Sequence, residues 1–412
     1  MGRVYKVDEF AVGFIALLSC FAISWLSIHR MILKHSGLKQ FTTAILGSGS
    51  LYFLLALYRI ANLEEMQEWT DGKGHHYLGE VAAYRLETEG LGRFLLDIKP
   101  GNVFYQSMTG VAYFTFGSHP EIIYAASACL GFMSVVLLLD SLVRVFPNAF
   151  PGALIYCTAA VLFLPTALFW SPFNLKEGPI AWCIVSLLRI VSYSKENRVS
   201  IYDVFVALLG VFLRPHIYVC WLAGVGFTRL FFRFNIVFAL FFLAIGCVCL
   251  LLVESLIPGS VTDFANTVSE AEAMTEKNSA TQGNFKISGK PIPFFTGGLL
   301  LLIRPYPWEI NSISSLATGL EIWTFTLLGL VGWLRCKRKL QLLQTPLVMT
   351  CIISFILLCL PFSFFYNMGL LARQRLQAYP AIVVISLAPY LQAIADRTSQ
   401  RITIVGLRKL DD

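Results

Sequence analysis

Charged residues are scarce in this sequence. Asp, Glu, Lys and Arg make up 14% of its 412 residues, whereas a soluble globular protein carries about 25%. The mean hydropathy of +0.67 is too high to come from one buried core. These values exclude an ordinary soluble enzyme. The net charge of +7 does not indicate nucleic-acid binding, because the basic residues stand at the ends of apolar runs.

Other common features are also missing. No Gly-rich phosphate loop follows a strand pattern and no P-loop occurs, so no nucleotide-binding fold is indicated. The two long polar segments contain none of the ten cysteines, which argues against a disulfide framework and favours cysteine as a small apolar side chain. No tandem repeat or linker divides the chain, so we expect one membrane domain over residues 1–412.

The sequence contains several long apolar blocks. Four clear examples are residues 10–28, 122–143, 236–253 and 345–365. Each is close to the ~20 residues that a helix needs to cross the hydrocarbon layer. Because strands with open edges would leave backbone groups unpaired in lipid, these blocks must be helices. The sequence predicts an all-α, polytopic membrane helix bundle with about 10–13 membrane segments.

The positions of Lys and Arg predict the orientation of these segments. Basic residues gather in short loops such as 29–40 and 335–339, which the positive-inside rule places in the cytoplasm. The opposite side then receives a first exterior loop, 61–101, and a second, 257–292, which we expect to form small helical caps. The runs 104–117 and 294–303 are too short to cross, and we expect them to dip into the membrane or lie along its surface.

Polar groups gathered at one membrane surface indicate a site there. The first exterior loop carries Asp71 between Trp69 and Tyr77, and such a carboxylate could deprotonate an acceptor hydroxyl. A solvated loop acid is the alternative interpretation. The adjacent His75 and His76 leave a divalent metal open, while no cofactor is assigned.

The other exterior segments supply mostly cations. Several cations at one face suit a phosphate or diphosphate at headgroup level, although interfacial side chains of no chemical role are the alternative. We expect substrate contacts from Asn102, Tyr105, Lys176, Glu177, Arg214, His216, Arg304, Arg373 and Arg375.

Three stretches resemble the GT-C superfamily of membrane glycosyltransferases, of the protein-mannosyltransferase and aminoarabinose-transferase kind. They are the acid-bearing first exterior loop with Gly101-Asn-Val-Phe-Tyr105, the run from Leu164-Pro165 to Lys176-Glu177, and Arg373-Gln-Arg375 before Pro380. The resemblance implies that Asp71 is the catalytic acid–base residue and that Arg373 or Arg375 binds the lipid phosphate.

The same resemblance implies a function. A sugar would pass from a polyprenyl-phosphate-type lipid donor to an acceptor hydroxyl at the non-cytoplasmic face of the bacterial inner (plasma) membrane. The expected partners are the lipid-linked sugar donor, a glycan, lipid or protein acceptor, and membrane lipid, with no nucleic acid.

Three other functions stay open at this point. An O-antigen-type polysaccharide polymerase or ligase also uses lipid-linked glycans, large exterior loops and arginines. A lipid-linked glycan transporter or flippase is less favoured, because no internal symmetry is visible in the sequence. Charged residues deep inside the apolar blocks are also scarce, and the main candidates are Asp140, Asp203 and Glu321. The remaining alternative is a purely structural membrane subunit.

Overall fold

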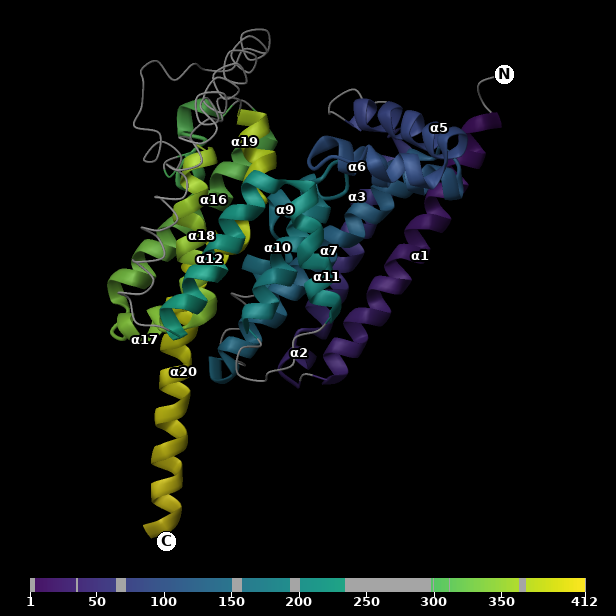
Figure 1. Ribbon diagram of the computed structural model, residues 1–412. Helices are drawn as coiled ribbons and strands as arrows, with labels where there is room; N and C mark the ends of the chain where they lie inside the picture. Colours follow the sequence, from purple (N-terminus) through teal and green to yellow (C-terminus); the bar gives the residue numbers. More distant parts are fainter. Residues whose placement is uncertain are drawn as a thin grey trace, which may run out of the picture.

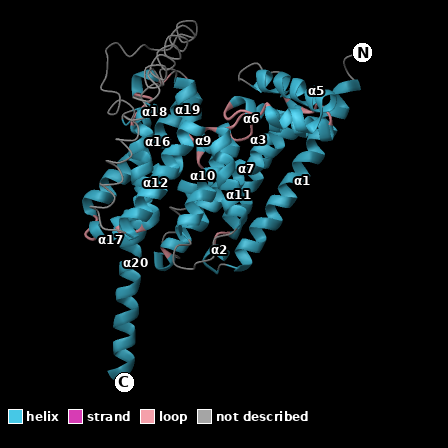
Figure 2. Ribbon diagram, in the orientation of Figure 1, coloured by secondary structure: helices cyan, strands magenta, loops and turns pink. Residues whose placement is uncertain are grey.

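The protein is a bundle of helices, seen in Figure 1. The computed structural model describes residues 4–34, 36–63, 72–149, 158–192, 201–233, 298, 300–310, 312–362 and 368–411. Within these ranges every regular element is a helix and no strand occurs, as Figure 2 shows. The predicted all-α class is therefore confirmed.

The first half of the bundle runs from the N-terminus to the start of the candidate site. Its elements are α1 (Val4–Lys34), α2 (Ser36–Lys39), α3 (Thr42–Ala61), α5 (Gly72–Leu96), α6 (Asn102–Phe116), α7 (Pro120–Val145), η1 (Pro147–Ala149), η2 (Thr158–Leu162) and α9 (Pro165–Trp170).

The second half follows the polar run 171–176. Its elements are α10 (Glu177–Ser192), α11 (Ile201–Leu213), α12 (Pro215–Arg233), η3 (Pro307–Glu309), α16 (Ile313–Arg335), α17 (Lys339–Leu343), α18 (Pro346–Phe362), α19 (Met368–Arg375) and α20 (Tyr379–Asp411).

Five of the described helices contain a stretch long and apolar enough to cross a membrane. These stretches are Phe10–Lys34, Thr42–Ala61, Pro120–Val145, Ser315–Arg335 and Tyr379–Thr398. They confirm a multi-pass membrane protein. Shorter apolar helices lie at Ala160–Trp170, Ile201–Leu213 and Pro346–Cys359. The predicted block 236–253 and the second exterior loop lie outside the described residues, and the total of about 10–13 segments stays a prediction.

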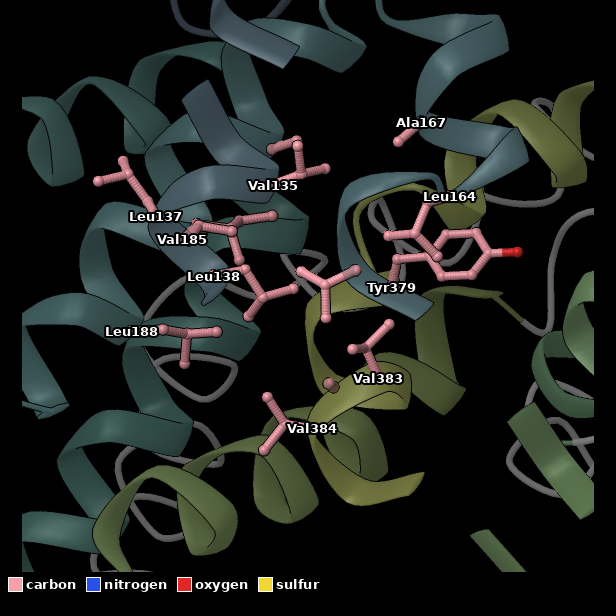
Figure 3. Packing of buried hydrophobic residues seen from close by; sticks show 14 of the residues in the cluster. Val135, Leu137, Leu138, Leu164, Ala167, Val185, Leu188, Tyr379, Val383 and Val384 are labelled. Atoms are coloured by element: carbon pink, nitrogen blue, oxygen red, sulfur yellow. The ribbon is translucent and has the colours of Figure 1, made fainter. Parts of the chain in front are cut away.

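Helix α7 forms the centre of the bundle. Of its apolar stretch 83% is buried inside the protein, against 22% for that of α1, which lies at the periphery. Figure 3 shows how Val135 and Leu138 of α7 face Val185 of α10 and Val383 of α20 across this core. Between these helices lies an apolar cavity of about 10 Å³, which is too small for a substrate.

The bundle has two chemically different ends. Helix α2, within the basic segment 29–40, and helix α17, which begins at the end of the basic segment 335–339, both lie at the lower end of the bundle in Figure 1. Helices α5, α6 and α19 lie at the opposite end. We call the first the basic end. We call the second the site end, because α10 and α12 both begin there and the candidate site described below lies at their first residues.

Helices α5 and α6 lie across the site end rather than along the bundle (Figure 1). Gly90, with φ of 78°, divides α5 into two helical parts. The amide of Gly101 donates to the carbonyl of Phe212 at 2.7 Å, which fixes the start of α6 against the end of α11. Residues 72–96 of the predicted first exterior loop are therefore helical, and the side of the membrane on which they lie stays a prediction.

Candidate functional site

The candidate site centres on Glu177, the first residue of α10. Its side chain is fully buried. Carboxylate oxygen Oε1 accepts a hydrogen bond from Nη2 of Arg214 at 2.8 Å and lies 3.1 Å from Nε of Arg373. Arg214 directly precedes α12, and Arg373 belongs to α19. One carboxylate therefore joins three segments that are far apart in the sequence.

The position of Glu177 explains why its charge is tolerated there. An acid in the first turn of a helix interacts favourably with the unpaired N–H groups of that turn. A buried charge is nevertheless costly unless it meets opposite charges with good geometry, and the two guanidinium groups supply these. Oxygen Oε2 of Glu177 is buried and accepts no hydrogen bond from a described residue, so it can accept one from a ligand hydroxyl or water.

The helix α6 meets the segment before Glu177. Lys176 Nζ donates a hydrogen bond to Oδ1 of Asn102. The hydroxyl of Tyr105 donates to Oδ1 of Asn174 at 2.9 Å, and Nδ2 of Asn174 donates to the carbonyl of Gly72 at 3.3 Å. Burial raises the pKa of Tyr105 well above its usual value, so the hydroxyl stays protonated and keeps donating.

Five of the predicted residues thus come together in one cluster. We call Asn102, Lys176, Glu177, Arg214 and Arg373 the Glu177 cluster. Three of its four charged side chains are cations and one is an acid. Side chains of Lys176 and Arg214 are 8% and 5% exposed, so these positive charges lie where water screens them weakly.

The two other predicted arginines make different contacts. Arg304 pairs with Glu309, with Nη2 and Oε1 2.7 Å apart. Arg375 is fully buried, and its Nη2 donates to the carbonyls of Leu300 at 2.8 Å and of Arg304. Arg375 therefore fastens segment 300–309 to α19, whereas Arg373, two residues earlier, contacts the Glu177 cluster.

Two further predicted site residues are Asp71 and His216. Asp71 lies outside the described residues, although Gly72, next to it in sequence, is the residue that Asn174 contacts. His216 lies in the first turn of α12, close after Arg214.

The two adjacent histidines face different partners. The ring of His75 lies 5.1 Å from that of Tyr105, while Nδ1 of His76 lies 2.9 Å from the hydroxyl of Tyr113. Among the described residues, no group of three or more His, Cys, Asp or Glu side chains is placed to hold a metal ion.

Sequence reasoning missed two residues at this end. Asn174 stands inside a quoted motif, but its role in linking α6 to Gly72 could not be seen from the motif. Arg59, near the end of α3, is 3% exposed and its guanidinium lies 3.6 Å from the ring centre of Phe173. Arg59 ends an apolar run at the predicted exterior side, and this is the same signal that singled out Arg214.

A second buried ionic cluster lies at the basic end. Oδ2 of Asp140 accepts hydrogen bonds from Nε of Arg144 and of Arg189, both at 2.9 Å. Nη1 of Arg189 donates to both carboxylate oxygens of Asp203, at 3.1 and 3.2 Å. We call these four residues the Asp140 cluster. It joins the last turns of α7 and α10 to the first turn of α11.

The third internal acid, Glu321 of α16, is also bound by neighbours. Its Oε2 accepts from the amide of Thr166 at 3.0 Å and from the hydroxyl of Thr166 at 2.6 Å. Asp140, Asp203 and Glu321 thus each have partners within the bundle.

Comparisons with protein-family models, with curated proteins and with solved structures found no match to this chain.

Proposed function

We propose that this protein is a membrane glycosyltransferase that moves a sugar from a polyprenyl-phosphate-type lipid donor to an acceptor hydroxyl. The observation that supports it most is the Glu177 cluster, in which Glu177 joins Arg214 to Arg373 and follows Lys176 at one end of a membrane bundle. Arg and Lys are the side chains best suited to hold a phosphate.

The position of the cluster fits a lipid-linked donor. It lies at the site end, where spanning helices finish and polar headgroups are expected. A donor could keep its hydrocarbon chain in lipid while its phosphate contacts Lys176, Arg214 and Arg373. Glu177 holds the two arginines in place, and its free oxygen Oε2 is available to accept a hydrogen bond from a sugar hydroxyl.

In the proposed reaction the acceptor oxygen attacks the anomeric carbon of the donor sugar. A new C–O bond forms, the bond from that carbon to the phosphate oxygen breaks, and the phosphate leaves with its electron pair. The cations stabilise this growing negative charge. Asp71 takes the acceptor proton, which favours inversion at the anomeric carbon. The assignment to Asp71 is supported by Gly72, the next residue in sequence, whose carbonyl accepts a hydrogen bond from Nδ2 of Asn174 at 3.3 Å.

Sugar transfer in proteoliposomes tests the proposal. With a radiolabelled polyprenyl-phosphate sugar as donor, Asp71→Asn and Arg373→Ala should each lower transfer by about 10²-fold or more, since removal of one group that stabilises developing charge typically costs that much. Arg93→Ala is the matched control, because the Arg93 side chain is 69% exposed on α5.

The assay also separates the competing functions. A product carrying one added sugar supports the proposal, and long glycan chains would assign a polymerase instead. Donor movement across the membrane without any new glycosidic bond would assign a transporter. Wild-type rates in both Asp71→Asn and Arg373→Ala would refute the assignment of these residues.

A further inference from the structure

Helix α6 has an unusual composition for a helix at the end of a bundle. Between Asn102 and Phe116 it contains no charged residue. One side is packed closely against α5, since a Cβ atom added at Gly110 would lie 2.6 Å from Cβ of Ala82. Met108 and Val111, which point away from this contact, are 50% and 38% exposed. The large apolar side chains of Val103, Phe114 and Phe116 are also exposed, at 40–65%.

This apolar surface continues onto α11. The rings of Phe104 and Phe212 stack with their centres 5.3 Å apart, at the point where Gly101 is bonded to the carbonyl of Phe212. Below Phe212, helix α11 exposes Phe205 and Leu208 at 61% and 56%. Exposed apolar side chains therefore follow α11 towards the site end and continue onto α6 at the contact between Phe104 and Phe212.

The length of α11, compared with the thickness of the hydrocarbon layer, indicates the depth at which α6 lies. Its 13 residues extend over about 20 Å, whereas the hydrocarbon layer is about 30 Å thick. The basic end of α11 starts level with the end of α7, because Asp203 and Asp140 share Arg189. We take this level as one edge of the hydrocarbon layer, since the apolar stretch of α7 ends at Val145. The start of α6, which is fixed to the other end of α11, then lies within reach of lipid acyl chains.

We propose that α6 is an in-plane membrane helix whose exposed face is covered by the lipid of one leaflet. Its aromatic side chains Phe114 and Phe116 suit the boundary between acyl chains and headgroups. Asn102, at the start of α6, accepts a hydrogen bond from Lys176, so this placement puts Lys176 near the boundary between acyl chains and headgroups.

Photo-crosslinking to lipid tests this placement independently of any sugar transfer. The full chain carries p-benzoylphenylalanine at Met108 or Val111 in vesicles of radiolabelled phosphatidylethanolamine and phosphatidylglycerol. Phe205 on α11 serves as the lipid-exposed reference. Glu87, an exposed charged position on α5, is the matched water-facing control.

The expected result is lipid adduct at Met108 and Val111 that approaches the yield at Phe205 and exceeds that at Glu87 several-fold. Yields equal to that at Glu87 would overturn the proposal. Crosslinks from Met108 or Val111 to a second copy of the chain would also overturn it, because protein and not lipid would then cover α6. Loss of the lipid signal at Phe205 would overturn it too, since the exposed apolar side chains continue from there onto α6.

Discussion

The two ends of α10 carry two buried ionic clusters of different composition. At its last turn Arg189 belongs to the Asp140 cluster, in which two acids meet two arginines. At its first residue Glu177 belongs to a cluster in which the acid contacts two arginines, while Lys176, next to it in sequence, contacts Asn102. The first composition balances acids against arginines and suits a structural junction. The second gathers Arg and Lys, the side chains that suit a phosphate.

The largest expected effect on stability comes from a substitution that breaks the Asp140 cluster. Asp140→Asn leaves Arg144 and Arg189 without their shared carboxylate, and breaking a buried ion pair costs about 3–5 kcal/mol. The free energy of unfolding in detergent should fall accordingly, while sugar transfer per folded molecule stays near that of the wild type. An unchanged unfolding midpoint would remove the structural role assigned to this cluster.

A smaller effect should come from an added anion. Inorganic pyrophosphate should raise the unfolding temperature of the wild type, because a ligand at 100 times its Kd stabilises the folded state by about 2.7 kcal/mol. Asp140→Asn should gain as much as the wild type, and Arg214→Ala should gain little, because only the latter loses a cation of the Glu177 cluster. Equal gains in all three proteins would contradict anion binding at that cluster.

The smallest expected effect is the pH dependence of stability that comes from His76, which lies outside both clusters. Burial lowers the pKa of His76, and nearby Glu80 opposes this in part. Because the unfolded chain then binds a proton more readily than the folded one, His76 should reduce stability as pH falls from neutral through its unfolded pKa near 6.5.

The measurement compares unfolding temperatures of the wild type and His76→Gln at pH 7.5 and 5.5. We expect the variant to lose less stability on acidification, since glutamine does not titrate. A larger loss in His76→Gln than in the wild type would show that the sign is wrong. Both clusters should contribute equally to the two proteins, so the difference isolates this histidine.

Sequence reasoning found most of the charged members of the candidate site but not their pairing. Lys176, Arg214 and Arg373 were singled out as cations at the exterior end of apolar runs. The same reasoning grouped Arg375 with Arg373, yet Arg375 donates to the carbonyls of Leu300 and Arg304. Their spacing in the sequence could not separate the two arginines. Side chains two residues apart on a helix point in different directions, and only the tertiary structure shows which segment each of them contacts.

The sequence by itself determined that this is a helical membrane protein and which end of it gathers the polar groups. Both follow from one physical rule, since lipid excludes charge and unpaired backbone groups along the whole chain. Only the tertiary structure decided that Glu177 joins Arg214 to Arg373 and that Asp140 and Asp203 share Arg189. These contacts depend on which helices lie side by side, and hydrophobicity along the sequence does not encode that.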